Sequence, residues 1–424
     1  MPRTPLPTSA TGYTPSGLED RKGMLDLFPV GPEPQTELAR YRILSPKAGV
    51  RVSPLCLGAM SLGDQWTGWM GGKLDQEESN KLLDAFYEAG GNFIDTANNY
   101  QDEQSELIIG EWMEKRKVRD EIVLATKYTT YAMNRKEGRQ KGLGVNYMGN
   151  HVGGQLSDHH QPDSVEIALV NRKSLYLTVS DSLKKLRTSY IDLLYVHWWD
   201  YTTSVEEVML GLNDLVREGK VMYLGVSDTP AWIVAQANQF AREHALQQFV
   251  VYQGNWSLAK RDMERDIIPM CRAFGMAVAP WGVMGGGKFK DPDEIKARKE
   301  AGTLRSGTEP TEDDIKVSQA LKEVAQEIGG EIHLASIALA WCRQMYPDCY
   351  PLIGGTKLSQ LRSNIDALKI HLTPEQMEKL SNAVPFDWGF PYDFFGRDPH
   401  GLPGGTTYSP LFNTAGRIKF VTWP

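Results

Sequence analysis

Short apolar runs alternate with amphipathic stretches along most of the chain. Apolar runs of four to eight residues are typical of strands buried in a parallel sheet, and apolar positions three or four residues apart indicate helices packed on it. The runs lie near 54–58, 92–96, 121–126, 190–197, 221–226, 249–253, 276–280 and 350–354. Helical patterns lie near 76–89, 103–116, 169–187, 204–218, 230–245, 261–274, 312–328 with 332–346, and 358–369. Eight strand–helix units predict an α/β fold, the (β/α)8 TIM barrel.

An open, doubly wound sheet is the alternative fold for such an alternation. That fold carries a glycine fingerprint for phosphate after its first strand. Here the corresponding turn, 58–63, reads Gly-Ala-Met-Ser-Leu-Gly and matches the fingerprint poorly. The barrel is therefore the better interpretation.

The barrel domain is expected to span 39–384 and to begin with a hairpin whose strands lie around 40–43 and 50–53. Residues 1–38 are rich in Pro, Thr, Ser and Gly and lack periodicity, so we expect an N-terminal extension there. Residues 385–424 are rich in aromatic residues, Gly and Pro, and we expect a C-terminal tail packed on the barrel.

Two long polar loops interrupt the alternation, at 129–166 after the third strand and at 285–311 after the seventh. Both follow the carboxyl ends of strands. In a TIM barrel these ends meet at one mouth, which carries the functional site. Loops of this length are usually functional or disordered, so we expect them to cover that mouth.

Composition narrows the class of protein. Hydrophobic residues make up 41% of the chain, enough for a sizeable core. The net charge of -7 and the pI near 5.7 argue against binding to nucleic acid or to an anionic membrane. No apolar run reaches the ~20 residues of a membrane span, and the chain does not begin with an apolar signal core. Four widely spaced cysteines predict neither a metal site nor a disulfide framework, so we expect a cytoplasmic protein.

Four polar side chains stand at or just after the ends of predicted strands. Asp95 ends the second strand and Tyr100 follows five residues later. Lys127 and His197 end the next two strands. Because these strand ends meet at the barrel mouth, we expect the four side chains to lie together.

Such a set is suited to moving a proton onto a carbonyl oxygen. A free phenol has a pKa of ~10, and an ammonium ~4 Å away favours the phenolate by ~4 kcal/mol at an effective dielectric constant of ~20. We therefore expect Lys127 to lower the pKa of Tyr100 by up to ~3 units, with desolvation opposing part of the shift. Asp95 would keep the ammonium charged, and His197 would orient the carbonyl. Each residue alone has a simpler explanation as a cap or a solvated group, but their joint order and spacing favour catalysis.

This order and spacing resemble the aldo-keto reductase superfamily, with matching neighbours in Asn-Phe-Ile-Asp-Thr-Ala at 92–97 and Val-His-Trp at 196–198. Longer strings resemble the fungal aryl-alcohol dehydrogenases and norsolorinic acid reductases within it, at 197–200, 225–232, 251–257 and 279–289. The resemblance implies an NADP(H)-dependent oxidoreductase of aromatic aldehydes, ketones or alcohols in fungal aromatic or polyketide (secondary) metabolism. It implies the catalytic roles given above and leaves a homo-oligomer open.

The resemblance also implies which residues hold the nicotinamide end of the cofactor. Ser227 and Asp228 stand where the family holds the carboxamide with Ser-Asn, so Asp228 departs from the pattern. Gln253 matches the family's Gln for the same group. Trp281 is expected to cover the ring where many relatives use a nearby tyrosine.

The phosphates and the adenine are expected on the loops after the last two strands. Glycine lets a backbone approach a phosphate, lysine adds charge, and helix N-termini attract anions. Because Thr356 stands where relatives often carry Arg, the preference for NADP over NAD is expected to depend on Lys357. The full set of candidates is Gly282, Gly286, Lys288, Gly354, Gly355, Thr356, Lys357, Gln360 and Asn364.

Tryptophans near the mouth are candidates for the substrate pocket. Trp66 and Trp69 follow the first strand, and Trp198 follows His197. Aromatic walls would suit a flat aromatic carbonyl. The aromatic residues of the tail are better explained by packing on the barrel.

Two other functions remain open from the sequence. A non-catalytic, nucleotide-binding regulatory subunit, like the β subunits of potassium channels, would have the same fold and keep the same four residues. A barrel lyase or hydrolase would use Asp95 and His197 as an acid–base pair, which leaves the Tyr–Lys spacing without a purpose.

Overall fold

The computed structural model describes residues 33–67, 74–130, 171–290 and 309–398, together with 294, 295, 297, 300 and 402. The elements named below lie in the unit that begins at Thr36.

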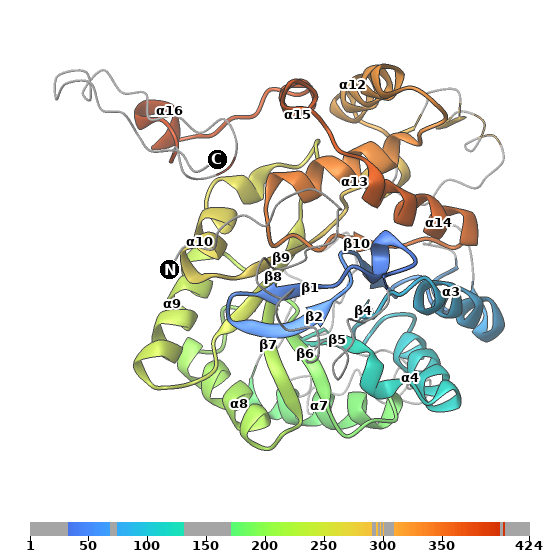
Figure 1. Cartoon of the computed structure of the whole chain (residues 1–424). Helices are drawn as coiled ribbons and strands as arrows, with labels where there is room; N and C mark the ends of the chain where they lie inside the picture. Colours follow the sequence, from blue (N-terminus) through green and yellow to red (C-terminus); the bar gives the residue numbers. More distant parts are fainter. Residues whose placement is uncertain are drawn as a thin grey trace, which may run out of the picture. The chain divides into compact units, whose positions relative to one another are not determined.

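Eight parallel strands form the centre of this unit, and neighbours in the chain are neighbours in the sheet. β10 returns to pair with β3, and the backbone of Val278 exchanges hydrogen bonds with Asp348 and Tyr350, just before β10. This link completes the ring of strands seen in Figure 1 and confirms the predicted (β/α)8 TIM barrel. The strands are β3 (Cys56–Gly58), β4 (Phe93–Asp95), β5 (Val123–Tyr128), β6 (Ile191–Val196), β7 (Val221–Ser227), β8 (Phe249–Asn255), β9 (Ala277–Trp281) and β10 (Leu352–Ile353).

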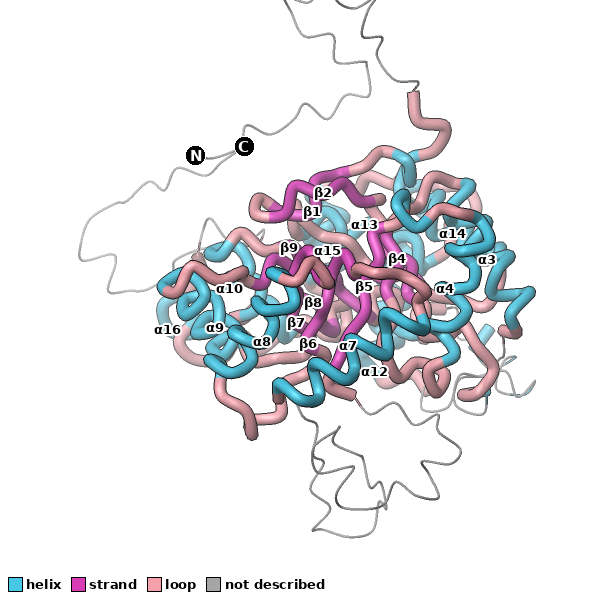
Figure 2. Tube along the Cα trace, turned by 90° about the horizontal axis from the view of Figure 1, so that it is seen from below, coloured by secondary structure: helices cyan, strands magenta, loops and turns pink. Residues whose placement is uncertain are grey.

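Helices surround the strands, as the tube in Figure 2 shows. Short polar side chains begin several of them: Asp75 and Thr311 close capping boxes, and Asn171 and Ser204 accept hydrogen bonds from first-turn N–H groups. The helices are α3 (Gln76–Glu88), α4 (Gln104–Arg116), α7 (Arg172–Lys185), α8 (Val205–Arg217), α9 (Ala231–Glu243), α10 (Ile267–Phe274), α12 (Glu312–Ile328), α13 (Leu334–Met345) and α14 (Leu358–Asp366).

The helix expected at 261–274 is divided in two. A short turn, η4 (Asp262–Glu264), comes first, and α10 begins only at Ile267. Arg261 forms a buried ion pair with Glu264 across this turn. One further helix, α15 (Pro374–Ser381), was not predicted from the sequence. Its start nevertheless carries a capping box formed by Thr373 and Gln376.

The predicted hairpin is confirmed as β1 (Arg42–Ser45) and β2 (Ala48–Val52). Its residues Leu44 and Val52 belong to one buried cluster with barrel residues that lie mostly in the first halves of the strands. The Tyr350 hydroxyl donates a 2.6 Å hydrogen bond to the carbonyl of Ile43. The hairpin therefore closes the end where the strands begin and crosses the barrel in Figure 1. The opposite end, where the strands finish, is left for the functional site.

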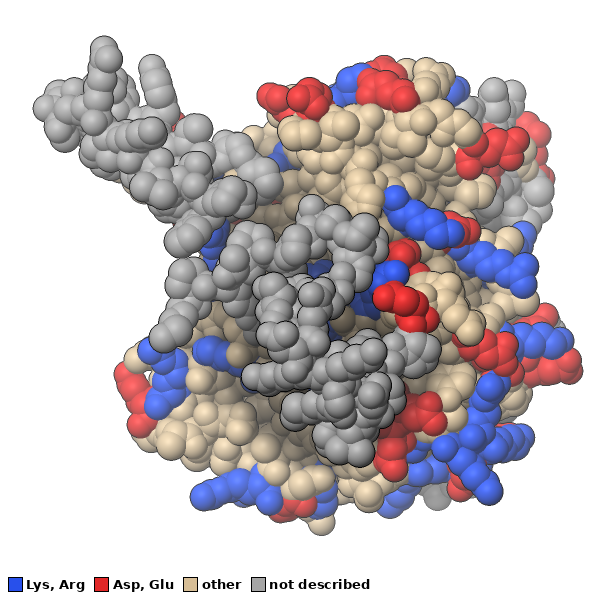
Figure 3. Space-filling model, in the orientation of Figure 1, with Lys and Arg blue, Asp and Glu red and all other residues tan. Residues whose placement is uncertain are grey.

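Charges of both signs mix on the face drawn in Figure 3. Pairs such as Arg116 with Asp84 and Arg187 with Glu114 place opposite charges side by side on the described surface. No helix within the described residues has the length and apolar character needed to cross a membrane.

Candidate active site at the mouth of the barrel

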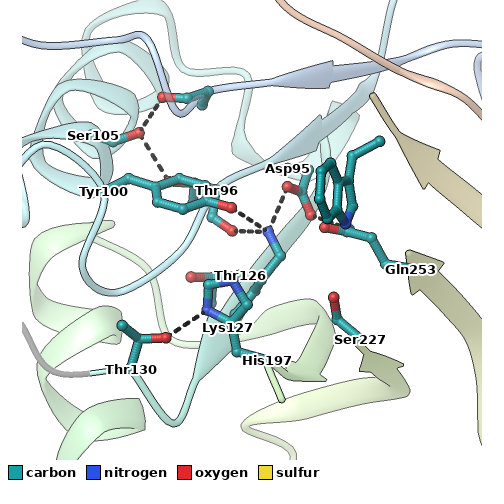
Figure 4. A network of polar contacts seen from close by, with 12 residues as sticks. Asp95, Thr96, Tyr100, Ser105, Thr126, Lys127, Thr130, His197, Ser227 and Gln253 are labelled. Carbon is teal, nitrogen blue, oxygen red and sulfur yellow. Dashed lines mark hydrogen bonds and ion pairs between the residues drawn. The ribbon is translucent and has the colours of Figure 1, made fainter. Parts of the chain in front are cut away.

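The mouth brings together the four polar side chains that the sequence singled out. Asp95 is the last residue of β4, Lys127 lies near the end of β5, and His197 directly follows β6. These strands are neighbours in the sheet, so their ends are adjacent. Tyr100 reaches the same place from the turn after β4, and Figure 4 shows its hydroxyl pointing toward the ammonium of Lys127.

Lys127 is the centre of this group, and its side chain is 0% exposed. Its Nζ donates to Asp95 Oδ2 at 2.5 Å, to the backbone carbonyl of Thr96 at 2.7 Å and to Tyr100 Oη at 3.4 Å. These bonds use all three N–H donors of an ammonium. The Thr96 carbonyl was not predicted, because a backbone acceptor leaves no signal in the side-chain pattern.

Charge is retained inside this buried group. Burial works against the charged form of Lys127, but Asp95 and Tyr100 outweigh it and hold the pKa of Lys127 above its usual value. Burial raises the pKa of Asp95, while the ammonium and a hydrogen bond from Gln253 counteract part of that rise. The 2.5 Å contact identifies the two as a buried ion pair, in which each charge compensates the other.

The expected lowering of the Tyr100 pKa is wrong. Tyr100 keeps an edge at the mouth but is otherwise enclosed by protein, and this burial raises its pKa above 10.0. Lys127 offsets only part of the rise, because the Asp95 carboxylate lies closer to the ammonium and itself disfavours a phenolate. Tyr100 is therefore held as a protonated donor at neutral pH.

His197 faces the same phenol from the end of β6. Its ring lies edge-on to that of Tyr100, with centroids 6.0 Å apart. Its Nδ1 lies 3.0 Å from Thr130 Oγ1, and a dashed line marks this contact in Figure 4. Burial, followed by the Lys127 charge, holds the pKa of His197 well below 6.5, so its ring is neutral.

The turn that carries Tyr100 has an unusual backbone. Gln101, Asp102 and Glu103 have φ angles of 52°, 51° and 76°, three successive non-glycine residues in the left-handed region. Gln101 Nε2 donates to the carbonyl of Met60, and Glu103 pairs with Lys185 at 3.2 Å. These contacts hold the turn, and they could not be predicted from the sequence because left-handed non-glycine residues have no distinctive pattern.

The candidates for the nicotinamide end lie at the ends of β7, β8 and β9. Gln253 Nε2 donates to Asp95 Oδ1 at 2.9 Å, so this residue also belongs to the proton-transfer group. Ser227 Oγ and Trp281 Nε1 each donate to Asp228, both at 3.3 Å. Asp228 is exposed at the mouth yet flanked by protein on most sides, and this desolvation raises its pKa to about 6.

The loop after β9 presents open backbone. Gly286 and Gly287 have φ angles of 62° and 96°, and a Cβ on either would meet nothing within 4 Å. A Cβ on Gly282 would lie 2.7 Å from Asn255 Oδ1, so only glycine fits there without a shift. The Nζ of Lys288, a candidate for the phosphates, forms an ion pair with Asp314 Oδ2 at 3.1 Å.

The segment after β10 leads directly into α14. Lys357 is the N-cap residue of this helix, and its side chain makes no capping hydrogen bond. Gln360 Oε1 instead accepts a hydrogen bond from the backbone N–H of Thr356 at 3.1 Å, beside Gly355. A Cβ added to Gly354 would meet no atom closer than 3.8 Å, so there is room beside this residue. Asn364, farther along α14, is buried. The turn at Gly354 therefore leads into a helix whose N-cap residue, Lys357, leaves the first N–H groups without its own side-chain cap.

Two of the predicted substrate tryptophans flank the Tyr100 group. The Trp66 ring lies edge-on to Tyr100, with centroids 6.2 Å apart, and its Nε1 donates to Asp102 at 2.9 Å. Trp198 Nε1 donates to Thr130 Oγ1 at 2.8 Å. Trp69 lies outside the described residues, as does most of the loop expected at 129–166.

The described part of the C-terminal tail contacts the rim near η4. Phe386 lies under the guanidinium groups of Arg261 and Arg265, and Tyr392 Oη donates to Asp266 at 2.9 Å. These residues pack on the rim, as expected for the tail aromatics, whereas Phe390 and Phe394 are exposed.

Comparison with known proteins gives the same grouping. Residues 54–384 match the model of the aldo/keto reductase family. The aryl-alcohol dehydrogenase (NADP(+)) of Phanerodontia chrysosporium is 47% identical over 94% of this chain and 98% of its own length. An aldo-keto reductase of Emericella nidulans is 48% identical over 94% of both chains, and norsolorinic acid reductase A of Aspergillus parasiticus is 49% identical over 88% of both. The chain belongs to the aldo/keto reductase family of oxidoreductases.

Proposed function

We propose that the protein is an NADP(H)-dependent reductase of aromatic aldehydes or ketones that also oxidises the corresponding alcohols. The observation that carries the proposal is the contact of Tyr100 Oη with the buried Lys127–Asp95 pair, beside a neutral His197. The names of relatives support the cofactor and the substrate class, since one is an aryl-alcohol dehydrogenase (NADP(+)) and another a norsolorinic acid reductase.

The residues at the mouth fit a nicotinamide dinucleotide phosphate. Ser227, Asp228 and Gln253 offer donors and acceptors for a carboxamide, and Trp281, 39% exposed, offers a ring face. Open space above Gly286 and Gly287 admits a pyrophosphate close to the backbone. The uncapped start of α14, with Lys357 beside it, suits the remaining phosphate.

In reduction, a bound nicotinamide supplies the hydride for the carbonyl carbon. Tyr100 Oη gives its proton to the carbonyl oxygen, and the new O–H bond completes the alcohol. The phenolate left behind faces the Lys127 ammonium at 3.4 Å, which stabilises it until solvent returns a proton. His197 orients the same oxygen by a hydrogen bond. Oxidation of the alcohol runs through the same contacts in reverse.

The substrate pocket is proposed to lie between Trp66 and Trp198. Their indole N–H groups are engaged by Asp102 and Thr130, which leaves apolar ring surface as their contribution to a ligand. Flat aromatic carbonyl compounds suit such walls.

The test is NADPH oxidation with a panel of benzaldehydes. The wild-type protein is expected to turn over, and Tyr100→Phe to lose about 10³-fold in kcat, the usual order for a positioned proton donor. Tyr195→Phe is the matched control, because its ring also lies near Lys127 Nζ, at 5.7 Å, but inside the barrel. Tight NADPH binding with no turnover would favour the nucleotide-binding subunit instead, and absence of NADPH binding would contradict both.

A further inference from the structure

We propose that Thr130 is a positioning residue that fixes His197 in the tautomer with its proton on Nε2. Its catalytic consequence depends on the proposed reductase function, because Nε2–H is then the group that donates to the carbonyl oxygen. The tautomer itself is a property of the protein alone.

The first step is the indole of Trp198. Trp198 Nε1 lies 2.8 Å from Thr130 Oγ1, and an indole nitrogen donates and never accepts. The direction of this hydrogen bond is therefore fixed, and Thr130 Oγ1 is its acceptor. The hydroxyl still has one proton to donate.

The second step is the imidazole. His197 Nδ1 lies 3.0 Å from the same oxygen, and across the described residues it is the acceptor in reach of the Thr130 hydroxyl proton. A proton on Nδ1 would direct two N–H donors at one oxygen and leave the hydroxyl proton without an acceptor among the described residues. The chain Trp198 N–H to Thr130 O–H to His197 Nδ1 satisfies every group and leaves the ring proton on Nε2.

The backbone around Thr130 fixes this geometry. Thr129 is fully buried with φ of 111°, outside the regions that a β-branched residue normally adopts. Such a conformation costs about 1–3 kcal/mol and persists only where the surroundings enforce it. Asn98 Nδ2 donates to the Thr130 carbonyl at 2.6 Å, and the His197 N–H donates to the carbonyl of Tyr128 at 3.1 Å. Thr130 is thus tied to the turn after β4, and His197 to the last residue of β5.

The neutrality of the ring makes the choice of tautomer meaningful. Lys127 lies close enough to disfavour an imidazolium, and the burial of His197 acts in the same direction on its pKa. A neutral ring carries a single N–H, so fixing Nδ1 as an acceptor determines the donor. Among the described residues, Thr130 makes the side-chain hydrogen bond to the ring that selects one nitrogen.

The direct test is NMR of protein labelled with 15N in its 8 histidines, without cofactor or substrate. His197 is assigned by its loss in His197→Gln. The wild type is expected to show protonated Nε2 and unprotonated Nδ1. Thr130→Val removes the hydroxyl at similar volume and is expected to shift His197 toward protonated Nδ1, whereas Thr130→Ser restores the wild-type pattern. A wild-type proton on Nδ1, or a Thr130→Val spectrum like the wild type, would overturn the proposal.

A second variant covers failure of Thr130→Val to fold. Trp198→Phe frees Thr130 Oγ1 to accept from Nδ1–H and is expected to lower the Nε2–H population, and an unchanged population would contradict the relay. In turnover, Thr130→Val is expected to lose roughly five- to tenfold in kcat, the scale of one neutral hydrogen bond, with NADPH affinity unchanged and Thr130→Ser near the wild type. If the NMR pattern holds but the wild type reduces no carbonyl compound, the proposed function fails and the tautomer assignment stands.

Discussion

The two sides of the barrel mouth are built in different ways. On the side of β4, β5 and β6, buried side chains bond to one another around Lys127, which uses its three donors within the protein. On the side of β9 and β10, the loops present glycines with open space above Gly286 and Gly287 and the uncapped start of α14. The first side holds its charged groups in contact with one another, and the second offers backbone groups and space to a ligand.

This contrast teaches how the mouth divides its work. Groups that move a proton must be held in place before the substrate arrives, and buried hydrogen bonds supply that order. Groups that hold an anion need free N–H donors and close approach. We therefore expect substitutions on the β4–β6 side to change rate or stability, and substitutions on the β9–β10 side to change cofactor affinity.

The largest effect is expected for Lys127→Met. The substitution leaves Asp95 buried without its partner, which should lower the free energy of unfolding by about 3–5 kcal/mol and abolish turnover. Adding Asp95→Asn should restore much of the stability, because the uncompensated charge is gone, but no activity. Urea unfolding and NADPH oxidation measure the two effects. A stable, active Lys127→Met protein would show that the pair is not central.

A smaller, selective effect is expected for Lys357→Ala. It should raise the Kd of NADPH roughly tenfold, the scale of one charge-assisted contact, and change the Kd of NADH and the saturated kcat much less. Lys369→Ala is the matched control, since Lys369 pairs with Asp366 at the far end of the same segment. Fluorescence titration measures both constants. An equal loss for NADPH and NADH would remove Lys357 from the phosphate site.

The smallest effect is expected for Asp228→Asn, in the pH dependence of stability. The pKa of Asp228 in the folded protein, about 6, lies above its ordinary 3.8, so the stability it contributes is present below 3.8 and lost as the pH rises through 6. The Asn variant should therefore gain on the wild type between pH 4 and pH 7.5, by less than about 1 kcal/mol because the carboxyl is exposed to solvent. Urea unfolding across this range measures the gain, and a difference independent of pH would contradict it.

The sequence predicts the barrel and its order of strands well, because each strand is a continuous apolar run that needs no tertiary information to recognise. It also places Asp95, Lys127 and His197 correctly, since a strand end fixes a position at the mouth. Thr130 and Gln101 were not found, because their roles depend on left-handed backbone at Thr129 and at Gln101 itself. Local pattern carries no information on such conformations.

The pKa of Tyr100 shows a different limit. The sequence places an ammonium near the phenol, but the balance between that charge and burial depends on where Asp95 lies and how deeply the ring is enclosed. In the structure Asp95 takes the shorter contact with Lys127, and burial determines the direction of the shift.

The most direct test of a preassembled, protonated Tyr100 is the pH dependence of kcat/KM for aldehyde reduction at saturating NADPH. Since the folded pKa lies above 10.0, the acid form persists, and the rate constant should stay level from pH 7 to about pH 9.5 and fall only beyond it. Repeating the profile in Asp228→Asn separates the titration of that carboxyl. A decline centred near pH 7 in both proteins would show an acidified phenol and contradict the account.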